Sequence, residues 1–481
     1  MQLRTVLHHR FRADGEAAGP EFVYVATSAA ILGLDAHTAA IVEAFGGADG
    51  HDDEAWLATR PDRELAERSL HDLIDLGVVR PVGEPEAPRA ALPPMPFPLA
   101  TLVLNVTNKC NLSCTYCYEY GADRLTEGEG SKGAGKPRME DDTARQSIDF
   151  LLRSSGDRPQ VSITFFGGET LLNFPAIRAA VEYAEPRAAA LRKRVHYSLT
   201  TKATLLTDEV VEFLVRHRFG ITVSIDGDQQ EQDRHRTFQR GVGSFEVIAP
   251  RIRHLLATNK AQKGRAIGAR VTLTAGAAPA PQTFHFLRDE LGFDEVGFAP
   301  VTAGLGRAYA LGELGYERLL REFAELADEY VAAALRDETH GFANLNDILR
   351  ELHQGVHKAH PCGAGLGLLG VSTEGEIGLC HRFVESKDHG LGNVATGLDE
   401  AQRTTFLQKA HIDQKTDCRQ CFAKPLCAGG CYHEAHVRYG DATHANLHYC
   451  EWIRGFVALG LRSYARILTR NPKFFARFET S

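Results

Sequence analysis

Three cysteines lie close together on one short stretch of the chain, Cys110-Asn-Leu-Ser-Cys114-Thr-Tyr-Cys117. Thiolates are the ligands that iron–sulfur clusters select. Three of them at this spacing can hold three irons of a cubane cluster and leave the fourth iron open. A zinc site would instead need a fourth nearby ligand to close its tetrahedron. The spacing therefore predicts an iron–sulfur cluster with one open iron.

The other seven cysteines form a second group, which begins after a gap of 244 residues. In a reducing compartment, clustered cysteines are more often metal ligands than disulfides. So many thiols in fewer than ninety residues, with glycines between them, predict a loop-rich fold organised by metal. Spacing alone leaves a pair of zinc sites open as the generic alternative. The seven are Cys362, Cys380, Cys418, Cys421, Cys427, Cys431 and Cys450.

An alternation of strands and helices, which begins at residue 101, must position these groups. Six β/α units predict a parallel sheet, open or closed into a barrel. Folds of this kind place their chemistry in loops after the carboxyl ends of the strands, and the first cysteine loop follows the first strand directly. The expected strands are Thr101–Val106, Val161–Phe166, Val195–Thr200, Ile221–Ile225, Ile267–Leu273 and Glu295–Ala299.

The first cysteine loop resembles the signature of the radical S-adenosylmethionine (SAM) superfamily, whose open iron binds the amino and carboxylate groups of the cofactor. The segment Phe166-Gly167-Gly168-Glu169 after the second strand is similar to the GGE motif of that family, which contacts the methionine amino group. By position, Tyr116 corresponds to an aromatic residue near the adenine. After the third strand, Lys202-Ala203 departs from the usual TNGTLL pattern.

The fourth strand ends in Ser-Ile-Asp-Gly, which is similar to a stretch of the peptide-modifying branch of this superfamily. The resemblance implies that Ser224 and Arg236 hold the methionine carboxylate, a pairing that suits a guanidinium fork. It also places Thr201 or Thr204 near the ribose. Asp226 is either a catalytic carboxylate or a loop cap, because Asp-Gly is also a common turn.

The later cysteines resemble the SPASM module of radical peptide maturases, which holds two auxiliary 4Fe–4S clusters. With the first cluster, the resemblance implies S-adenosylmethionine and three 4Fe–4S clusters as cofactors. Two clusters bound wholly by cysteine need eight thiolates, so the nearer one lacks a fourth cysteine. Water, His357, His360 or a substrate thiolate remain as ligands. The implied sets are Cys418, Cys421, Cys427 and Cys450 for the distal cluster, and Cys362, Cys380 and Cys431 for the nearer one.

The resemblance covers nearly the whole chain and predicts an α/β fold of several parts. Seven of the 20 prolines fall between Pro81 and Pro98, so the connection there should be extended, and we expect the Gly-rich Gly121–Pro137 to be a mobile loop. The expected parts are a winged-helix-like module that recognises a leader or substrate peptide by strand addition (1–83), a Pro-rich linker (84–100), a radical SAM partial (β/α)6 TIM-type barrel (101–340), a SPASM domain (341–455) and a C-terminal helix and tail (456–481).

Within this branch, Thr101–Cys110 and Cys117-Tyr-Glu-Tyr-Gly121 resemble the maturation enzymes of quinohemoprotein amine dehydrogenase. Members of that family form thioether bonds between cysteine sulfurs and methylene carbons of Asp or Glu in the small (gamma) subunit. The expected substrate is therefore a small protein rich in Cys and Asp/Glu, with Asp226 as a base for the thiol. Alternatives are another crosslinking peptide maturase, an anaerobic sulfatase (formylglycine) maturase, or a non-catalytic zinc-binding peptide chaperone. Sulfatase maturases commonly carry Asp where this chain has His381.

Composition narrows the remaining possibilities. The 481 residues are 43% hydrophobic and 24% charged with a net charge of -8, which gives no basic surface for nucleic acid. No apolar run approaches the roughly 18 residues that a membrane span needs, and the N-terminus lacks the apolar stretch of a signal peptide. We expect a cytoplasmic enzyme that takes electrons from a donor such as flavodoxin or ferredoxin.

Overall fold

The computed structural model describes residues 1–14, 19–47, 50–84, 92–118, 138–304, 306–386 and 388–479. The expected loop Gly121–Pro137 lies outside these ranges. Within them, no helix is both long and apolar enough to cross a membrane.

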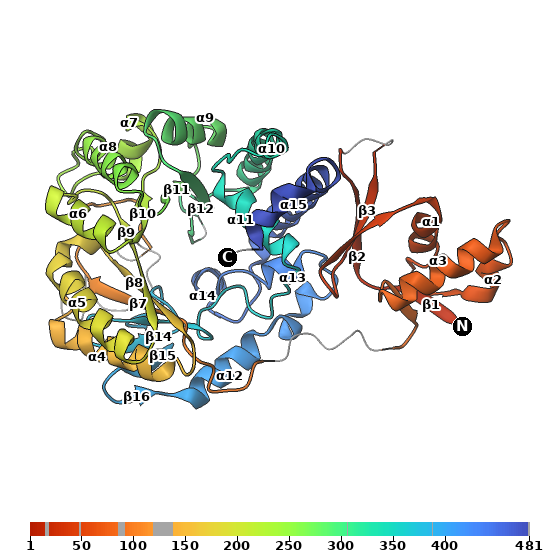
Figure 1. Ribbon diagram of the computed structural model, residues 1–481, viewed down its shortest axis with the longest axis horizontal. Coiled ribbons are helices and arrows are strands. Elements are labelled where there is room, and N and C mark those ends of the chain that lie inside the picture. Colours follow the sequence, from red (N-terminus) through yellow and green to blue (C-terminus); the bar gives the residue numbers. More distant parts are fainter. Residues whose placement is uncertain are drawn as a thin grey trace.

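Six parallel strands form the largest part of the fold, and they are the six that the sequence predicts (Figure 1). Their order in the sheet follows the chain, with β7 and β12 farthest apart. The predicted parallel α/β sheet is therefore confirmed. The strands are β7 (Thr101–Thr107), β8 (Gln160–Gly167), β9 (Arg194–Thr201), β10 (Gly220–Ser224), β11 (Ile267–Leu273) and β12 (Glu295–Pro300).

Alternating burial explains why these segments are strands. In β8 the side chains of Val161, Ile163 and Phe165 are buried, while those between them are only half-buried. The helices between the strands carry one apolar face toward the sheet; in α6 the hydroxyl of Thr207 caps the first turn. The helices are α4 (Asp141–Ser154), α5 (Phe174–Ala190), α6 (Asp208–Arg216), α7 (Gln229–His235), α8 (Phe245–Ala261), α9 (Ala280–His285) and α10 (Glu313–Leu335).

The C-terminal region joins the same sheet. β13 (Leu368–Val371) runs parallel to β7, and Leu368 is opposite Thr101. From there β14 (Glu376–Gly378), β15 (Gly390–Asn393) and β16 (Gly397–Leu398) continue the sheet with antiparallel pairing. The second cysteine region is therefore attached directly to the first strand of the barrel.

Helices surround the later cysteines. The last long helix, α15, packs against α10 and α11. It runs from Cys450 to Arg470, so the expected boundary between residues 455 and 456 falls inside one continuous helix. The helices of this region are α11 (Ala343–His353), α12 (Glu400–Ala410), α13 (Lys424–Cys427), α14 (Tyr432–Tyr439) and α15.

The N-terminal residues form two small antiparallel sheets, ordered β5-β1-β6 and β2-β3-β4. The first sheet packs with the helices of this region around a separate core, to which the second sheet adds Val23 and Val25 of β3. The second contributes Phe11, Phe22 and Tyr24 to the main core, and β2 lies beside α15 (Figure 1). The elements are β1 (Gln2–Thr5), β2 (His8–Arg12), β3 (Glu21–Val25), β4 (Ala30–Leu34), β5 (His51–Asp52), β6 (Val79–Pro81), α1 (Ala36–Ala44), α2 (Asp53–Leu57) and α3 (Arg63–Asp75).

Candidate active site

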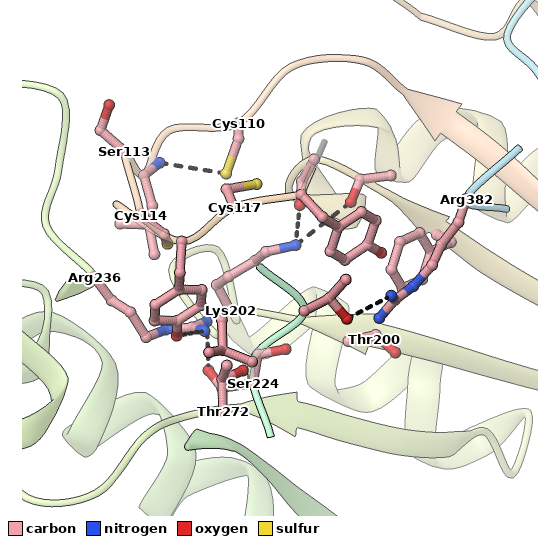
Figure 2. Close-up of a pocket in the computed structure, with 18 of the residues that line it drawn as sticks. Cys110, Ser113, Cys114, Cys117, Thr200, Lys202, Ser224, Arg236, Thr272 and Arg382 are labelled. Atoms are coloured by element: carbon pink, nitrogen blue, oxygen red, sulfur yellow. Dashed lines mark hydrogen bonds between the residues drawn. The ribbon is translucent and has the colours of Figure 1, made fainter. Parts of the chain in front are cut away.

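A cavity of about 510 Å³ lies at the carboxyl ends of the barrel strands (Figure 2). Its size is within the ordinary range for a cofactor or substrate site. The first cysteine loop forms one side, and the ends of β8 to β12 form the floor. Arg382 enters from the C-terminal region, on the side away from Cys110 and Cys114 (Figure 2). Both cysteine regions therefore contribute to the walls of one cavity.

The first cysteine loop is held by the last residue of α7 and the segment that follows it. The Ser113 backbone N–H donates to the carbonyl oxygen of Thr237 at 2.8 Å, and that of Thr115 donates to His235 at 3.2 Å. These bonds fix the loop, from which all three of its cysteines line the cavity. The predicted convergence of these thiols on one site agrees with the structure.

The end of β8 brings the backbone close to the cavity. Gly167 has a φ of +136°, and a Cβ there would overlap the Thr107 carbonyl oxygen, so only glycine fits. Gly167 and Gly168 line the cavity. Glu169 is fully buried and does not line it; its carboxylate accepts hydrogen bonds from one group of the following turn and two at the end of β9. The donors are the backbone N–H of Leu171 (3.0 Å), the Thr201 hydroxyl (2.7 Å) and the backbone N–H of Lys202 (2.7 Å).

Arg236, Asp226 and Tyr116 form a buried polar unit. The Tyr116 hydroxyl donates to Asp226, while Arg236 donates to the Tyr116 oxygen at 3.0 Å and to the Ser224 carbonyl at 2.9 Å. The Asp226 carboxylate also accepts from the Thr272 backbone N–H at 3.1 Å and lies 3.8 Å from the Arg236 guanidinium. Burial, and to a lesser extent Asp226, raise the pKa of Tyr116 well above its usual value, so the phenol stays protonated.

Two further cations point into the cavity. Lys202 donates to the Gly168 carbonyl oxygen and lies 3.4 Å from that of Gly167. Arg382 lies over the ring of Tyr118, with its guanidinium carbon 4.2 Å from the ring centre, and donates to the Thr302 hydroxyl at 3.2 Å. The sequence marked Lys202 only as a departure from a motif and did not single out Arg382. A cation two residues after Cys380 was the only available signal for Arg382.

The structure places the seven later cysteines in two groups. Four line one small cavity: Cys418, Cys421, Cys427 and Cys450. The thiols of the other three lie close enough to interact: those of Cys431 and Cys362 add to the effect of burial, which raises the pKa of Cys380 to about 12. None of the ten cysteines forms a disulfide. Within the described residues, no three Cys, His, Asp or Glu side chains are close enough together to bind one metal ion.

Comparison with known proteins agrees with this geometry. Residues 104–260, which include the first cysteine loop and the first four strands, match the model of the Radical SAM superfamily. The chain is an enzyme whose barrel segment is similar to the Radical SAM superfamily. Its C-terminal cysteine-rich region fits a SPASM domain.

Several relatives of this chain are sulfatase-maturating enzymes. The serine-type anaerobic sulfatase-maturating enzyme of Bacteroides thetaiotaomicron is 26% identical over 376 residues, 72% of this chain and 86% of that protein. The cysteine-type enzyme of Clostridium perfringens is 23% identical over 352 residues, 69% of this chain and 89% of that protein. The solved structure "Native anSMEcpe with bound AdoMet" has the same fold, with a TM-score of 0.63 at 18% identity, covering 80% of this chain and all of that one.

Radical SAM enzymes use S-adenosylmethionine and a 4Fe–4S cluster, and the residues of the first cysteine loop fit this cluster. The three thiols share one cavity wall. Burial raises the pKa of Cys110, so a thiolate there requires the positive charge of a metal to be stable at neutral pH. The same reasoning holds for Cys418 and Cys427, whose pKa values burial raises to about 11 and about 12.

The structure brings some of the predicted cofactor-binding residues to the cavity and not others. Those that line it are Tyr116, Gly167, Gly168, Ser224 and Arg236. Glu169, Thr201 and Asp226 do not line it, and each is instead engaged by the hydrogen bonds described above. Thr204 is paired with the side chain of Asn111. These buried residues hold the cavity-lining ones in place.

Proposed function

We propose that this radical SAM enzyme is a peptide maturase that joins cysteine sulfurs to methylene carbons of Asp or Glu in a small protein substrate. The small subunit of quinohemoprotein amine dehydrogenase is the substrate we favour, on the strength of the sequence around the first cysteine loop. The proposed enzyme binds its substrate peptide and takes electrons from a donor such as flavodoxin or ferredoxin. We propose that it acts in the cytoplasm.

The observation that carries the proposal is the meeting of both cysteine regions at one cavity. β13 pairs with β7, and Arg382, two residues after Cys380, lines the same cavity as Cys110. A substrate bound there would lie between the first cysteine loop and the Cys362, Cys380 and Cys431 thiols. Such a position suits a reaction in which a hydrogen atom and an electron leave the substrate at two different places.

Each crosslink removes two hydrogens, one from the thiol and one from the methylene carbon. When bound with its reduced cluster, S-adenosylmethionine would supply the acceptor of the methylene hydrogen atom, and an oxidised iron–sulfur cluster would supply the acceptor of the remaining electron. The new sulfur–carbon bond replaces one S–H and one C–H bond, and the thiol proton passes to a base. The chain's own groups bind and orient. We propose that Ser224 and Arg236 hold the methionine carboxylate, and that Asp226 keeps Arg236 and Tyr116 in place.

The test is mass spectrometry of the product of the reconstituted enzyme and a Cys- and Asp-containing substrate peptide. A loss of two hydrogens per crosslink, with fragmentation that links Cys to Asp or Glu, is the expected result. Replacement of Cys110, Cys114 and Cys117 together by Ala should abolish 5′-deoxyadenosine formation. A product with an aldehyde and no crosslink would contradict the thioether assignment.

Formylglycine formation is the second candidate, and the relatives favour it. Sulfatase-maturating enzymes match about 70% of this chain. Against it stands His381, at a place where those enzymes commonly carry Asp. Its ring packs on Phe166, with the centroids 4.4 Å apart, so this position offers no carboxylate base. A sulfatase-derived peptide with Cys or Ser at the target position distinguishes the two reactions in the same assay.

A further inference from the structure

The charges that line the active-site cavity are all of one sign. Four cationic side chains line it: Lys109, Lys202, Arg236 and Arg382. No carboxylate does so among the residues that the structure describes. Arg236 has its counter-charge behind the cavity wall, in Asp226 at 3.8 Å. The excess positive charge is therefore concentrated at the other cations.

Arg382 is the best oriented of these. Its guanidinium is stacked on Tyr118 at 4.2 Å, and one N–H group donates to Thr302 at 3.2 Å. In the described part of the chain it makes no ion pair with a carboxylate. An arginine is charged at all accessible pH values, and its planar fork matches a carboxylate with two parallel hydrogen bonds. Stacking and the single bond to Thr302 fix the plane and leave further N–H groups available.

The position of Arg382 separates it from the groups assigned to the cofactor. It enters the cavity on the side away from Cys110 and Cys114, whereas Arg236 lies on the side of Cys114 and donates to the Ser224 carbonyl (Figure 2). Lys202 lies between these two sides, with its ammonium group on the carbonyl oxygens of Gly167 and Gly168. The Lys202 ammonium group adds positive potential to the cavity, but it does not offer two parallel N–H donors as a guanidinium does.

We propose that Arg382 recognises a carboxylate side chain of the peptide substrate, and so places an Asp or Glu methylene in the cavity. The inference rests on the proposed function and gives it a specificity residue. General attraction cannot supply this preference, because the whole chain has a net charge of -8 and repels acidic peptides at long range. Selection of an acidic residue must therefore come from a local, desolvated cation.

The test is a binding competition without turnover. Reconstituted full-length enzyme, with S-adenosylmethionine and no reductant, is equilibrated anaerobically with an equimolar mixture of synthetic peptides. The peptides share one Cys and differ at one position, which is Asp, Asn or Ala, and mass spectrometry gives their ratio in the bound fraction. Wild-type enzyme should enrich the Asp peptide over the Asn peptide by about tenfold or more, as expected for a charge-assisted bidentate pair.

Arg382→Gln should bring this ratio close to one, and Arg382→Lys should give an intermediate value. Arg336→Gln, which changes an exposed arginine paired with Glu338, is the matched control and should keep the wild-type ratio. A merely structural role of Arg382 would weaken binding of all peptides equally and leave the ratio unchanged. That result would overturn the inference, as would a wild-type ratio of one.

Two further measurements keep the outcomes apart. Equilibrium dialysis of S-adenosylmethionine reports whether Arg382→Gln lowers the affinity for the cofactor instead. Lower cofactor affinity with an unchanged peptide ratio would assign Arg382 to the cofactor and overturn the inference.

Addition of reductant then starts the reaction and identifies the product. Acid preference in binding with an aldehyde product would contradict only the proposed function, whereas a thioether product without acid preference would contradict only the role of Arg382.

Discussion

At the scale of single residues, the site contains charges with two different purposes. Arg236 is buried and balanced by Asp226, which itself accepts bonds from Tyr116 and Thr272. Breaking a buried pair by removing one partner is costly, because it leaves the other charge without compensation. Arg382, in contrast, has no carboxylate partner among the described residues. The first arrangement holds Arg236 in place, and the second leaves the charge of Arg382 available to a ligand.

The position of Asp226 behind the cavity wall leads to a prediction that separates positioning from proton transfer. Asp226→Asn keeps the shape of the side chain but removes the charge that balances Arg236. If Asp226 orients Arg236 and Tyr116, the variant should lose S-adenosylmethionine affinity and 5′-deoxyadenosine formation together with crosslinking, by about tenfold or more. The measurement is cofactor dialysis beside product analysis. If Asp226→Asn cleaves the cofactor normally but forms no crosslink, Asp226 acts as the base for the thiol, as the sequence analysis predicts.

Acid pH should destabilise the fold in part through His340. Burial lowers its pKa below 6.5, and Glu329 offsets this only partly. Below pH 6.5 the unfolded chain therefore binds a proton that the folded chain resists, so the free energy of unfolding falls as pH falls. The ring stacks on Phe284 with centroids 4.7 Å apart, and His340→Phe should fit there. Its urea midpoint should fall less between pH 7.5 and 5.5 than that of wild type.

The size of this effect has an upper limit. One histidine changes the slope by at most about 1.4 kcal/mol per pH unit. His71→Gln, on the exposed surface of α3, serves as the control. An identical pH dependence in wild type and His340→Phe would contradict the assignment.

At the scale of elements, the turn after β8 depends on one backbone conformation. Gly167 is in a positive-φ region, and an added Cβ would overlap the Thr107 carbonyl oxygen at the end of β7. Gly167→Ala should therefore displace Gly168 and the first cysteine loop and lower S-adenosylmethionine cleavage by about tenfold or more, since small displacements at a reacting centre are costly. Gly312→Ala, which has open space at the start of α10, should behave like wild type. Equal cleavage by the two variants would refute this role of the turn.

The sequence predicted those elements that a short segment of the chain specifies by itself. The alternation of strand and helix patterns predicted the six barrel strands to within one residue at each end, whereas the two later cysteine sets were implied by the resemblance to the SPASM module. The pairing of β13 with β7 joins residues more than 260 positions apart, and no local periodicity encodes it. Arg382 reaches the cavity only through that pairing. Lys202 showed a departure from a motif, but its contact with Gly168 depends on the relative position of two strand ends.

At the scale of the whole molecule, the N-terminal region is more firmly attached than a Pro-rich linker suggests. The β2–β3–β4 sheet contributes Phe11, Phe22 and Tyr24 to the main core. His9 on β2 stacks on Phe422 with the centroids 4.1 Å apart and the planes at 11°. Asp14 pairs with Arg470 at the end of α15, at 3.0 Å. A peptide held by this sheet would therefore be held at a fixed distance from the cysteine-rich region.

Deletion of residues 1–83 should accordingly do more than remove a peptide-binding module. It would expose the part of α15 that β2 covers, and each buried aromatic side chain contributes about 1.5–3 kcal/mol. We expect the truncated chain to unfold at a lower temperature than the full chain and to give little soluble protein. A truncated chain with an unchanged melting temperature would show that the N-terminal sheet is only tethered.

Cleavage of the connection tests the attachment without removing the sheet. A protease site placed between residues 84 and 92 allows the purified full-length enzyme to be cut after folding. The two fragments should still elute together in size-exclusion chromatography at 0.5 M NaCl, because their contact is mainly apolar and salt screens only the exposed Asp14 pairs. His9→Ala with Phe422→Ala should weaken this association, whereas Asp14→Ala should not. Separation of the wild-type fragments would mean that the peptide reaches the cavity by movement of a tethered module.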